Sequence, residues 1–588
     1  MAYKAPVEDM IFALQKVAGI GGLQGNAYPD FDIDLITPVL EEAGKLAGDV
    51  LAPLNQTGDE QGAQLTGDGV IAPHGFREAY QAFAEGGWMG LAAPVEWGGQ
   101  GLPKTLANAV LELFHGANMS FGLCPMLSLA AIEALIAHGS EADQKKYLPK
   151  LVSGEWTGTM NLTEPQAGSD VGALKTKAVP NGDGSYAISG QKIYITWGDH
   201  DMADNIIHLV LARLPDAPEG SKGVSLFVVP KVLVNEDGSL GERNGVNCIG
   251  LEKKIGIHAS PTCVMEYDGA QGWLVGQENR GLACMFTMMN SARLNVGHEG
   301  VGVGEAAYQT AYEYAQERKQ GRAEGVDGPA PILYHADVRR TLTTMRANVM
   351  AARSICFACG VAADTADTSE DKDAREAARL REDLLTPIAK AWATDMGVEV
   401  ASQGVQIHGG MGFMNETLAA QLYRDARIAP IYEGTNGIQA IDLVGRKLAM
   451  NDGKAMADMI AEVRDTAREA RETNDPQLVQ IADRVVAAAD ALEEATTWMV
   501  EAMKEDREKG LSGATAYLDL AGDVIGGHYL TRGALAARAD GGGMRGRMIA
   551  LAGYFAETSL AEAPGRVSGI THGGDAFLKE SEALFGLA

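Results

Sequence analysis

One acidic residue stands in surroundings that suit a catalytic base. Glu433 lies in the run A-P-I-Y-E-G-T-N-G-I-Q at 429–439, where Ile431 and Tyr432 precede it and Gly434 follows. A single carboxylate is nearly always solvated, so the ordinary interpretation is a surface residue. The two preceding side chains favour burial here, and a desolvated carboxylate is a more effective general base. The segment therefore makes Glu433 a candidate for removing a proton from a substrate.

Two earlier segments combine the residue types that a polar cofactor needs. The run L-T-E-P-Q-A-G-S-D at 162–170 could offer hydroxyls and backbone N–H groups to a phosphate or a heteroaromatic ring. Its alternative interpretation is a capped turn leading into a strand. The run G-Q-K-I-Y-I-T-W-G at 190–198 ends in two aromatic residues, so Tyr194 or Trp197 could cover a flat cofactor while Thr196 bonds its edge. Ordinary strand packing explains these aromatics equally well.

Other glycine- and cysteine-containing runs are interpreted as structural. The run G-V-G-V-G at 300–304 lies inside a helical pattern, which predicts close helix packing and fails as a dinucleotide fingerprint. Residues 403–412 end a helix in a glycine loop where backbone could approach a ligand, and His408 there has no second ligand at metal spacing. Cys356 and Cys359 form a C-x-x-C in a helical pattern, which favours core packing over redox or metal chemistry.

The elements that must position these residues fall into four blocks. Residues 1–154 are predicted to be helical, with the best segments at 37–52, 75–85, 106–117 and 127–138. Residues 155–276 change to short β-branched runs, best at 186–196, 206–214, 224–234 and 262–267. Strands that follow one another without helices between them predict an antiparallel barrel or sandwich.

Helical periodicity returns in the second half of the chain. It covers residues 277–450, with loops near 321–329 and 409–412. Asn451-Asp452-Gly453 is a plausible hinge, and residues 451–588 are predicted to hold four further helices that could form a bundle of their own: 456–471, 478–504, 514–536 and 544–558.

Composition limits the class of protein. A chain of 588 residues is too long for one core, so three or four domains are expected. The formal net charge of −29 repels nucleic acid and anionic membranes. Six irregularly spaced cysteines indicate a reducing compartment, and neither a leader pattern nor an unbroken run of about 18 apolar residues is present. The sequence predicts a soluble, cytoplasmic protein.

Together the candidate segments resemble the acyl-CoA dehydrogenase family. Four runs occur in the family's order and spacing: L-T-E-P-x-A-G-S-D at 162–170, G-x-K-x-x-I-T at 190–196, Q-x-x-G-G-x-G-F at 406–413 and Y-E-G-T-x-x-I-Q at 432–439. The resemblance spans residues 30–450 and implies an α+β fold, with an N-terminal helical domain, a middle antiparallel β domain and a C-terminal helical bundle. That order agrees with the blocks read from the pattern, and the extra C-terminal helical domain follows them.

The resemblance implies FAD as the cofactor. Its binding residues would be Met160, Leu162, Thr163, Gly168, Ser169, Tyr194, Ile195, Thr196, Arg318, Gln406, Gly409, Gly410, Thr435 and Asn436. Thr163 and Thr196 would bond the ring edge, and Ser169 would reach the phosphates or the CoA. Arg318, with residues 406–410, would contact the pyrophosphate of the FAD in the neighbouring subunit, while Thr435 and Asn436 touch the adenosine half. The site would therefore be completed only by oligomerisation.

The same resemblance assigns the chemistry. An acyl-CoA substrate would contact Ser169, Arg293, Glu433 and Gly434, with Arg293 on the CoA arm. Glu433 would take the α-proton while the β-carbon delivers hydride to the flavin, giving a trans-2-enoyl-CoA. Its backbone N–H and a ribityl hydroxyl would polarise the thioester carbonyl. Some relatives carry the base on the helix of Arg293, but Ala292 stands there in this chain. Electron-transferring flavoprotein would reoxidise the flavin, and no metal is expected.

Two positions depart from the family pattern. Many members read R-x-x-F-G after the interface arginine, whereas this chain reads R-K-Q-G-R at 318–322, so the aromatic contact to the cofactor must be absent or supplied elsewhere. Asn290 also stands where an acidic residue is frequent, which affects the expected CoA contacts.

The run Y-K-A-P-V-E-D-M at 3–10 and the long helical tail resemble the subgroup named for 3-methylthiopropionyl-CoA dehydrogenase. That subgroup makes methylthioacryloyl-CoA in dimethylsulfoniopropionate breakdown. Alternatives are a short- or medium-chain acyl-CoA dehydrogenase of another substrate, an acyl-CoA oxidase, a DNA-associated flavoprotein and a non-enzymatic assembly factor. Acidic pairs in the tail, Glu493-Glu494 and Glu505-Asp506, argue against DNA binding. A homodimer is expected, because a C-terminal domain can cover the surface that smaller members use to form tetramers.

Overall fold

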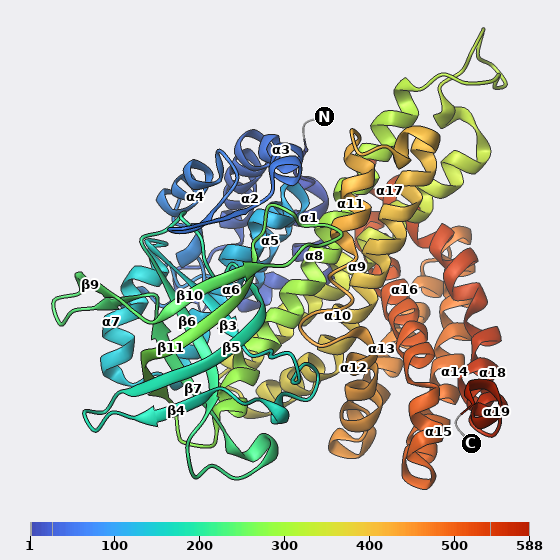
Figure 1. The fold of residues 1–588 in the computed structure, drawn as a ribbon. Coiled ribbons are helices and arrows are strands. Elements are labelled where there is room, and N and C mark those ends of the chain that lie inside the picture. Colours follow the sequence, from blue (N-terminus) through green and yellow to red (C-terminus); the bar gives the residue numbers. More distant parts are fainter. Residues whose placement is uncertain (1–2, 26–27, 541, 587–588) are drawn as a thin grey trace. The chain divides into compact units, whose positions relative to one another are not determined.

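The computed structural model describes residues 3–25, 28–540 and 542–586, and it divides into two compact units (Figure 1). One unit is mainly Val39–Asn295, and the other combines Pro6–Pro38 with Val296–Ala588. The first contains the predicted helical and β blocks, and the second contains the later helices. Each unit is described by itself.

The helical part of the first unit is built around aromatic side chains. Its elements are α2 (Ile36–Lys45), the π-helix Leu46–Leu51, α3 (Pro53–Gln61), α4 (Phe76–Glu85), α5 (Lys104–Ala117), α6 (Met119–His138) and α7 (Glu141–Val152). Phe83 packs edge-on against Phe114 and Phe121. The predicted helix 127–138 was too short, because the Asn118 side chain caps α6 by accepting from Phe121 N at 3.1 Å, and Pro125 is tolerated inside the helix.

Seven strands of the first unit form one sheet that closes on itself. They are β3 (Trp156–Asn161), β4 (Lys177–Pro180), β5 (Tyr186–Thr196), β6 (Asn205–Arg213), β7 (Val224–Pro230), β10 (Val246–Leu251) and β11 (Thr262–Val275). Strands β11, β5, β4, β6 and β7 pair in a ring, because β7 pairs with both β6 and β11. The middle β domain is confirmed (Figure 1).

The β structure differs from the prediction in several details. β3, which was not among the predicted strands, pairs parallel with β6, so the sheet is not purely antiparallel. Every residue of β3 is buried, so its sequence shows no alternation of apolar and polar residues. The predicted strand 224–234 is two strands, β7 and β8 (Val232–Val234), and β8 pairs with β9 (Leu240–Arg243). A further hairpin joins β1 (Gln64–Thr66) to β2 (Gly69–Ile71).

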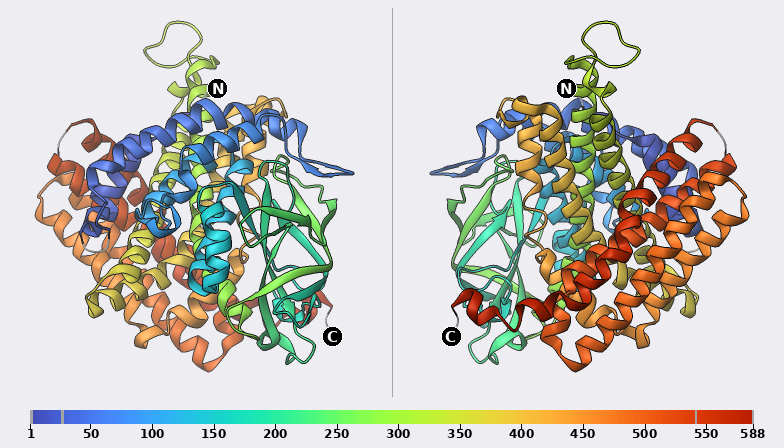
Figure 2. Two further views of the ribbon diagram at one scale, coloured as in Figure 1. Left: turned by 90° about the vertical axis from the view of Figure 1, so that its left-hand side faces the viewer. Right: turned by 90° about the vertical axis from the view of Figure 1, so that its right-hand side faces the viewer.

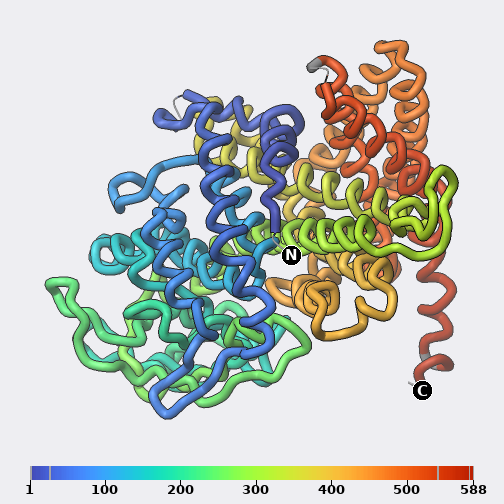
Figure 3. The backbone as a smooth tube through the Cα atoms, turned by 90° about the horizontal axis from the view of Figure 1, so that it is seen from above, coloured from blue at the N-terminus to red at the C-terminus, as the bar shows by residue number. Residues whose placement is uncertain are grey.

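Three long helices dominate the second unit. They are α8 (Gly281–Glu317), α9 (Ala336–Thr368) and α10 (Lys372–His408), followed by α11 (Leu418–Ala426) and α12 (Asn436–Asp442). A Cβ on Gly300 would collide with the Ala393 carbonyl of α10, and one on Gly397 would lie 2.6 Å from the Gly300 carbonyl oxygen. The prediction that the 300–304 glycines serve close helix packing is confirmed. Figure 3 traces this path as the green-to-orange part of the chain.

The C-terminal helices form a bundle that also packs on α9 and α10 (Figure 2). They are α13 (Lys454–Glu472), α14 (Pro476–Glu505), α15 (Arg507–Ser512), α16 (Ala514–Asp540), α17 (Gly543–Phe555), α18 (Ala561–Phe577) and α19 (Ser581–Phe585). The chain breaks at the predicted hinge, where Asn451 and Asp452 are left-handed. Four predicted helices are present, but α18 was missed because four glycines and Pro564 lower its helix propensity. Buried Val567 and Ile570 stabilise it by packing.

The first residues of the second unit are bound to its last helices. Val7–Phe12 forms α1, continued by the π-helix Ala13–Ala18, and this segment packs on α9 and α16. Asp9 is buried and pairs with Arg346 of α9 and, at 2.7 Å, with Arg547 of α17. The sequence predicted that this segment belongs to a helical domain of residues 1–154. In the structure, the ion pairs of Asp9 are instead with α9 and α17.

The cysteines are free, and the two most apolar helices are mostly buried. All six cysteines are free, and Cys356 and Cys359 are buried on α9, as core packing predicts. Two helices, α6 and α9, are long and apolar enough to cross a membrane, but 83% of each apolar window is buried inside the protein. Core helices of soluble proteins have this property.

Candidate active site

A buried ion pair shapes the 162–170 loop. The Lys192 Nζ of β5 lies 2.9 Å from Glu164 Oε1 and donates to the Leu162 carbonyl at the same distance. The carboxylate of Glu164 also accepts from Thr176 Oγ1 at 2.6 Å and from Lys175 N at 2.7 Å. Burial opposes ionisation, but the Lys192 charge and these hydrogen bonds together hold the pKa of Glu164 well below its usual range. The pair fixes the loop, while Gly168 and Ser169 stay exposed at its end.

Tyr194 occupies a bulge in β5. Ile195 pairs with Cys263 and Lys192 with Met265, so Ile193 and Tyr194 both lie opposite Val264. Tyr194 has φ of 60°, and its side chain is 60% exposed. A large aromatic residue held exposed in the left-handed region costs free energy, and such strain is typical of binding sites. This geometry favours Tyr194, with half-buried Thr196 beside it, as a surface for a flat ring.

Trp197 is a core residue. Its ring is buried, its Nε1 donates to the Ser120 carbonyl at 3.0 Å, and it stacks on Phe76. Of the two aromatic candidates in this run, packing explains Trp197, so Tyr194 is the one that stays a candidate for cofactor binding.

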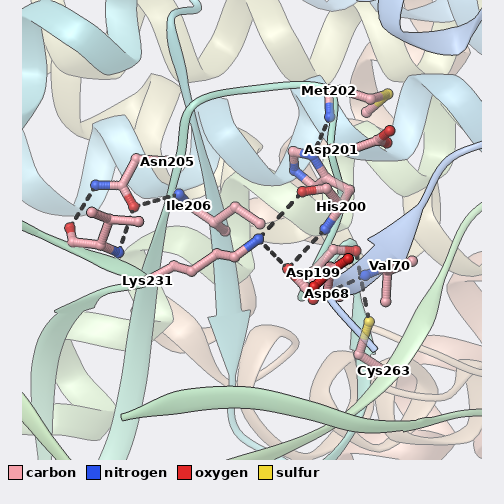
Figure 4. Close-up of polar contacts among 12 residues, drawn as sticks. Asp68, Val70, Asp199, His200, Asp201, Met202, Asn205, Ile206, Lys231 and Cys263 are labelled. Atoms are coloured by element: carbon pink, nitrogen blue, oxygen red, sulfur yellow. Dashed lines mark hydrogen bonds and ion pairs between the residues drawn. The ribbon is translucent and has the colours of Figure 1, made fainter. Parts of the chain in front are cut away.

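A buried polar cluster anchors the turn that follows Trp197 (Figure 4). Asp199 forms an ion pair with Lys231 and accepts from Val70 N at 3.2 Å. His200 accepts from Met202 N at 3.1 Å and bonds Thr157 Oγ1 at 2.9 Å. Burial lowers the pKa of His200 to about 3, and the Lys231 charge adds to this effect. The neutral ring and the ion pair make this cluster a rigid support for the end of β5.

The second unit contains a cavity at the end of α8. Its volume is about 400 Å³, and it is lined by Tyr314, Arg318, Gln320, Ile332, Ile407, His408, Gly409, Gly410 and Met411. The structure thus brings the predicted Arg318 together with Gly409 and Gly410. Gln406 is exposed and is not among the lining residues. The contacts of His408 are structural. Its Nδ1 lies 2.7 Å from the Gly404 carbonyl oxygen, and its ring stacks on Tyr314 with 4.3 Å between the ring centroids.

This cavity suits an anionic group beside an apolar surface. Arg318 is exposed and supplies a guanidinium to the cavity. Gly409 and Gly410 are also exposed, so their backbone groups are accessible. The stacked pair of Tyr314 and His408 forms an aromatic wall in the same cavity.

Glu433 lies in a strained segment between two anchored residues. It is half-buried and has φ of 53°, and Gly434 after it has φ of 85°. On one side, the Tyr432 hydroxyl donates to Glu299 Oε2 of α8. On the other side, Asn436 Oδ1 accepts from Lys390 Nζ of α10 at 2.8 Å. The segment therefore presents the carboxylate from a backbone held at both ends.

The residues after Glu433 begin a helix. Thr435 caps α12, because its Oγ1 accepts from Ile438 N at 3.2 Å. The Asn436 side chain is used within the unit, since its Nδ2 donates to the Ala391 carbonyl at 3.1 Å and to Thr394 Oγ1 at 3.0 Å. Any contact of Asn436 with a ligand would accordingly come from its backbone.

The remaining predicted residues lie in the first unit. Met160 and Ile195 are buried, and Leu162 and Thr163 are half-buried; the Thr163 carbonyl accepts from Ile193 N at 3.0 Å. Arg293 and Ala292 are buried on α8. Ala292 has no group that could act as a base, so this rival position offers no alternative to Glu433, which stays the candidate.

Sequence reasoning missed two buried charged residues beside the candidate base. Glu299 and Lys390 are both fully buried, yet each lies in a helical pattern where a charged residue normally marks the solvated face. Only the three-dimensional packing of α8 and α10 on the 432–436 segment shows their proximity to it.

The fold and the comparisons with known proteins together define a flavin-dependent dehydrogenase. Models of the acyl-CoA dehydrogenase N-terminal, middle and C-terminal domains match residues 39–155, 159–270 and 279–449, and a model described as acetyl-CoA dehydrogenase C-terminal like matches residues 459–579. The chain belongs to the acyl-CoA dehydrogenase family, whose members use FAD.

Particular relatives refine this assignment. The chain is 46% identical to 3-methylmercaptopropionyl-CoA dehydrogenase of Ruegeria pomeroyi over 99% of this chain and 100% of that protein. It is 37% identical to a butyryl-CoA dehydrogenase of Syntrophomonas wolfei over 79% of this chain and 78% of the relative. The structure of ACDH-11 of Caenorhabditis elegans, in complex with C11-CoA, has a TM-score of 0.79 at 21% identity, covering 95% of this chain and 92% of that one. That likeness supports the fold, including the C-terminal extension.

Proposed function

We propose that this acyl-CoA dehydrogenase acts on 3-methylthiopropionyl-CoA and forms methylthioacryloyl-CoA, a step of dimethylsulfoniopropionate breakdown. One observation carries the substrate: the identity to the Ruegeria pomeroyi enzyme extends over 99% of this chain. The match to the butyryl-CoA dehydrogenase is weaker and covers only 79% of it. A short- or medium-chain acyl-CoA is the second candidate for the substrate.

In the proposed reaction Glu433 accepts the proton from the α-carbon of the thioester. When bound, FAD supplies the acceptor for the hydride that leaves the β-carbon, so the two hydrogens depart as a proton and a hydride and a trans double bond remains. The backbone N–H of Glu433 donates to the thioester carbonyl and stabilises the charge that develops there. Arg293 and Ser169 bind the CoA arm, and Gly434 allows close approach of the acyl chain.

The resemblance to the family assigns the residues that would hold FAD. Thr163 and Thr196 bond the ring edge and Tyr194 covers it, supported by the strained bulge and the Glu164–Lys192 pair. Met160, Leu162, Gly168 and Ile195 provide backbone and apolar contacts, and Thr435 and Asn436 lie at the adenosine half. Arg318, Gly409 and Gly410 bind the pyrophosphate of the neighbouring subunit's FAD, with Gln406 close by, which requires a homodimer. Electron-transferring flavoprotein takes the electrons, and six free cysteines suit a cytoplasmic enzyme.

The substrate assignment predicts a selective response. Anaerobic bleaching of the flavin should be about tenfold more efficient, in kcat/KM, with 3-methylthiopropionyl-CoA than with butyryl-CoA, because one additional chain atom fills the pocket. Stopped-flow absorbance with both thioesters measures this ratio. A ratio of one or below favours the second candidate. Aerobic hydrogen peroxide formation at the dye-coupled rate would indicate an acyl-CoA oxidase instead.

The cavity assignment predicts a loss of cofactor affinity. Arg318→Ala should weaken FAD binding by roughly ten- to a hundredfold, because it removes charge-assisted hydrogen bonds to the pyrophosphate. Flavin retained per subunit after dilution and gel filtration measures the change. The control is Arg468→Ala on α13, an exposed residue paired with Asp465. Equal flavin retention in the two variants would remove Arg318 from the site.

A further inference from the structure

A buried carboxyl of α8 contacts the segment that carries the catalytic base. Glu299 is 0% exposed, and its Oε2 accepts the hydroxyl of Tyr432, the residue that precedes Glu433. Its Oε1 is buried and has no hydrogen-bond partner among the described residues. An ionised carboxylate with one oxygen unpartnered in the interior is costly, so this geometry suits a neutral carboxylic acid.

The charged groups around Glu299 come from two elements besides its own helix. Burial, with a smaller contribution from the nearby Glu433 charge, raises the pKa of Glu299 to about 8. The Tyr432 hydrogen bond and the Lys390 charge of α10 oppose this shift but do not cancel it. Burial also raises the pKa of Tyr432 well above its usual range, and Glu299 adds to this, so the phenol remains the donor.

The two anchors of the segment are both buried groups. Tyr432 is fixed by Glu299, and Asn436 is fixed by Lys390, while Glu433 and Gly434 between them both have positive φ. A left-handed conformation at a non-glycine residue costs free energy and persists only when its surroundings impose it. The contacts at Tyr432 and Asn436 provide that restraint.

We propose that neutral Glu299 and Tyr432 form a positioning pair that holds Glu433 in its left-handed conformation and keeps the Glu299 carboxyl from adding a negative charge beside it. The inference rests on the proposed role of Glu433 as the base. Ionisation of Glu299 would place a second negative charge beside the base and oppose the negative charge that develops on the thioester carbonyl. Turnover should therefore decline as pH rises through about 8, where Glu299 loses its proton.

Two variants of the FAD-loaded enzyme separate positioning from general stability. Glu299→Gln keeps an acceptor for the Tyr432 hydroxyl but cannot ionise, so it should retain activity at pH 7 and lose the decline above pH 8. Tyr432→Phe removes the hydrogen bond and should lower kcat about tenfold or more at every pH, with little change in KM. Controls are Glu501→Gln on α14 and Tyr423→Phe on α11, both exposed.

Anaerobic flavin bleaching by 3-methylthiopropionyl-CoA and by butyryl-CoA, measured from pH 6 to 9.5, gives the profiles. Infrared difference spectra of wild type minus Glu299→Gln should show a protonated carboxyl band at pH 7 that disappears as pH rises. The proposal would be overturned if Glu299→Gln lost activity above pH 8 as steeply as the wild type does. It would also be overturned if the protonated carboxyl band were absent at pH 7. If Tyr432→Phe fails to fold, the pH profile of Glu299→Gln and the protonated carboxyl band test the proposal without it. If Glu433→Gln loses flavin bleaching but the Glu299 and Tyr432 variants behave like the wild type, only the positioning pair is overturned. Full bleaching in Glu433→Gln would overturn the proposed function itself.

Discussion

Glu433→Gln should leave FAD and acyl-CoA bound while flavin bleaching falls by about 10²–10⁴-fold or more, the contribution expected of a positioned general base. The amide has nearly the same shape as the carboxylate, so the half-buried, left-handed position is preserved, but it cannot accept the α-proton. Anaerobic stopped-flow absorbance of the flavin measures the rate, and equilibrium titration with the thioester measures binding.

The matched control for this variant is Glu501→Gln on α14, which removes one exposed carboxylate far along the chain. It should bleach at the wild-type rate. Full bleaching in Glu433→Gln would show that another group takes the proton, and the assignment of the base would then be withdrawn.

Lys192→Met should lower the free energy of unfolding by about 3–5 kcal/mol, because it leaves the buried Glu164 carboxylate without its counter-charge. The 162–170 loop should become less ordered as well, and the affinity for FAD should fall. Urea unfolding followed by tryptophan fluorescence, together with flavin content, measures both effects. Lys145→Met is the control, since Lys145 and Glu141 form an exposed pair that is expected to contribute little to stability.

The same pair has a defined pH dependence. The folded-state pKa of Glu164 is lowered to about 2 from its ordinary value of 4.5, so its contribution to stability is present above pH 4.5 and is lost as pH falls toward 2. Without Lys192 the carboxyl should protonate on folding, and the acid dependence in that window should weaken. An unchanged acid profile and an unchanged unfolding midpoint in Lys192→Met would contradict the role of the pair.

Local patterns predicted much of the fold. The strand β5 begins and ends where the alternation of its residues indicated, and the hinge at 451–453 follows from turn-forming residues that are indeed left-handed. The helix-packing role of Gly300 and the core packing of Cys356 and Cys359 were also predictable, because the flanking residues have helical periodicity. These features depend on neighbours in sequence.

Features that depend on distant partners were not predictable. β3 is buried throughout and shows no alternation, and α18 has a composition that disfavours helix until α14 packs against it. In the site, the motifs indicated Arg318 with Gly409 and Gly410, which line one cavity. Glu299 and Lys390 were missed because a buried charge among helical residues looks the same in sequence as a solvated one.

The ion pair between Asp9 and Arg547 has a consequence for synthesis on the ribosome. The two residues are 538 positions apart, so at 5–20 residues per second the N-terminal segment waits roughly half a minute to two minutes for its partner. Throughout that interval Asp9 and the apolar face of α1 have emerged while α9, α16 and α17 have not all been made. Folding of this unit is therefore completed only after the segment that carries Arg547 has been synthesised.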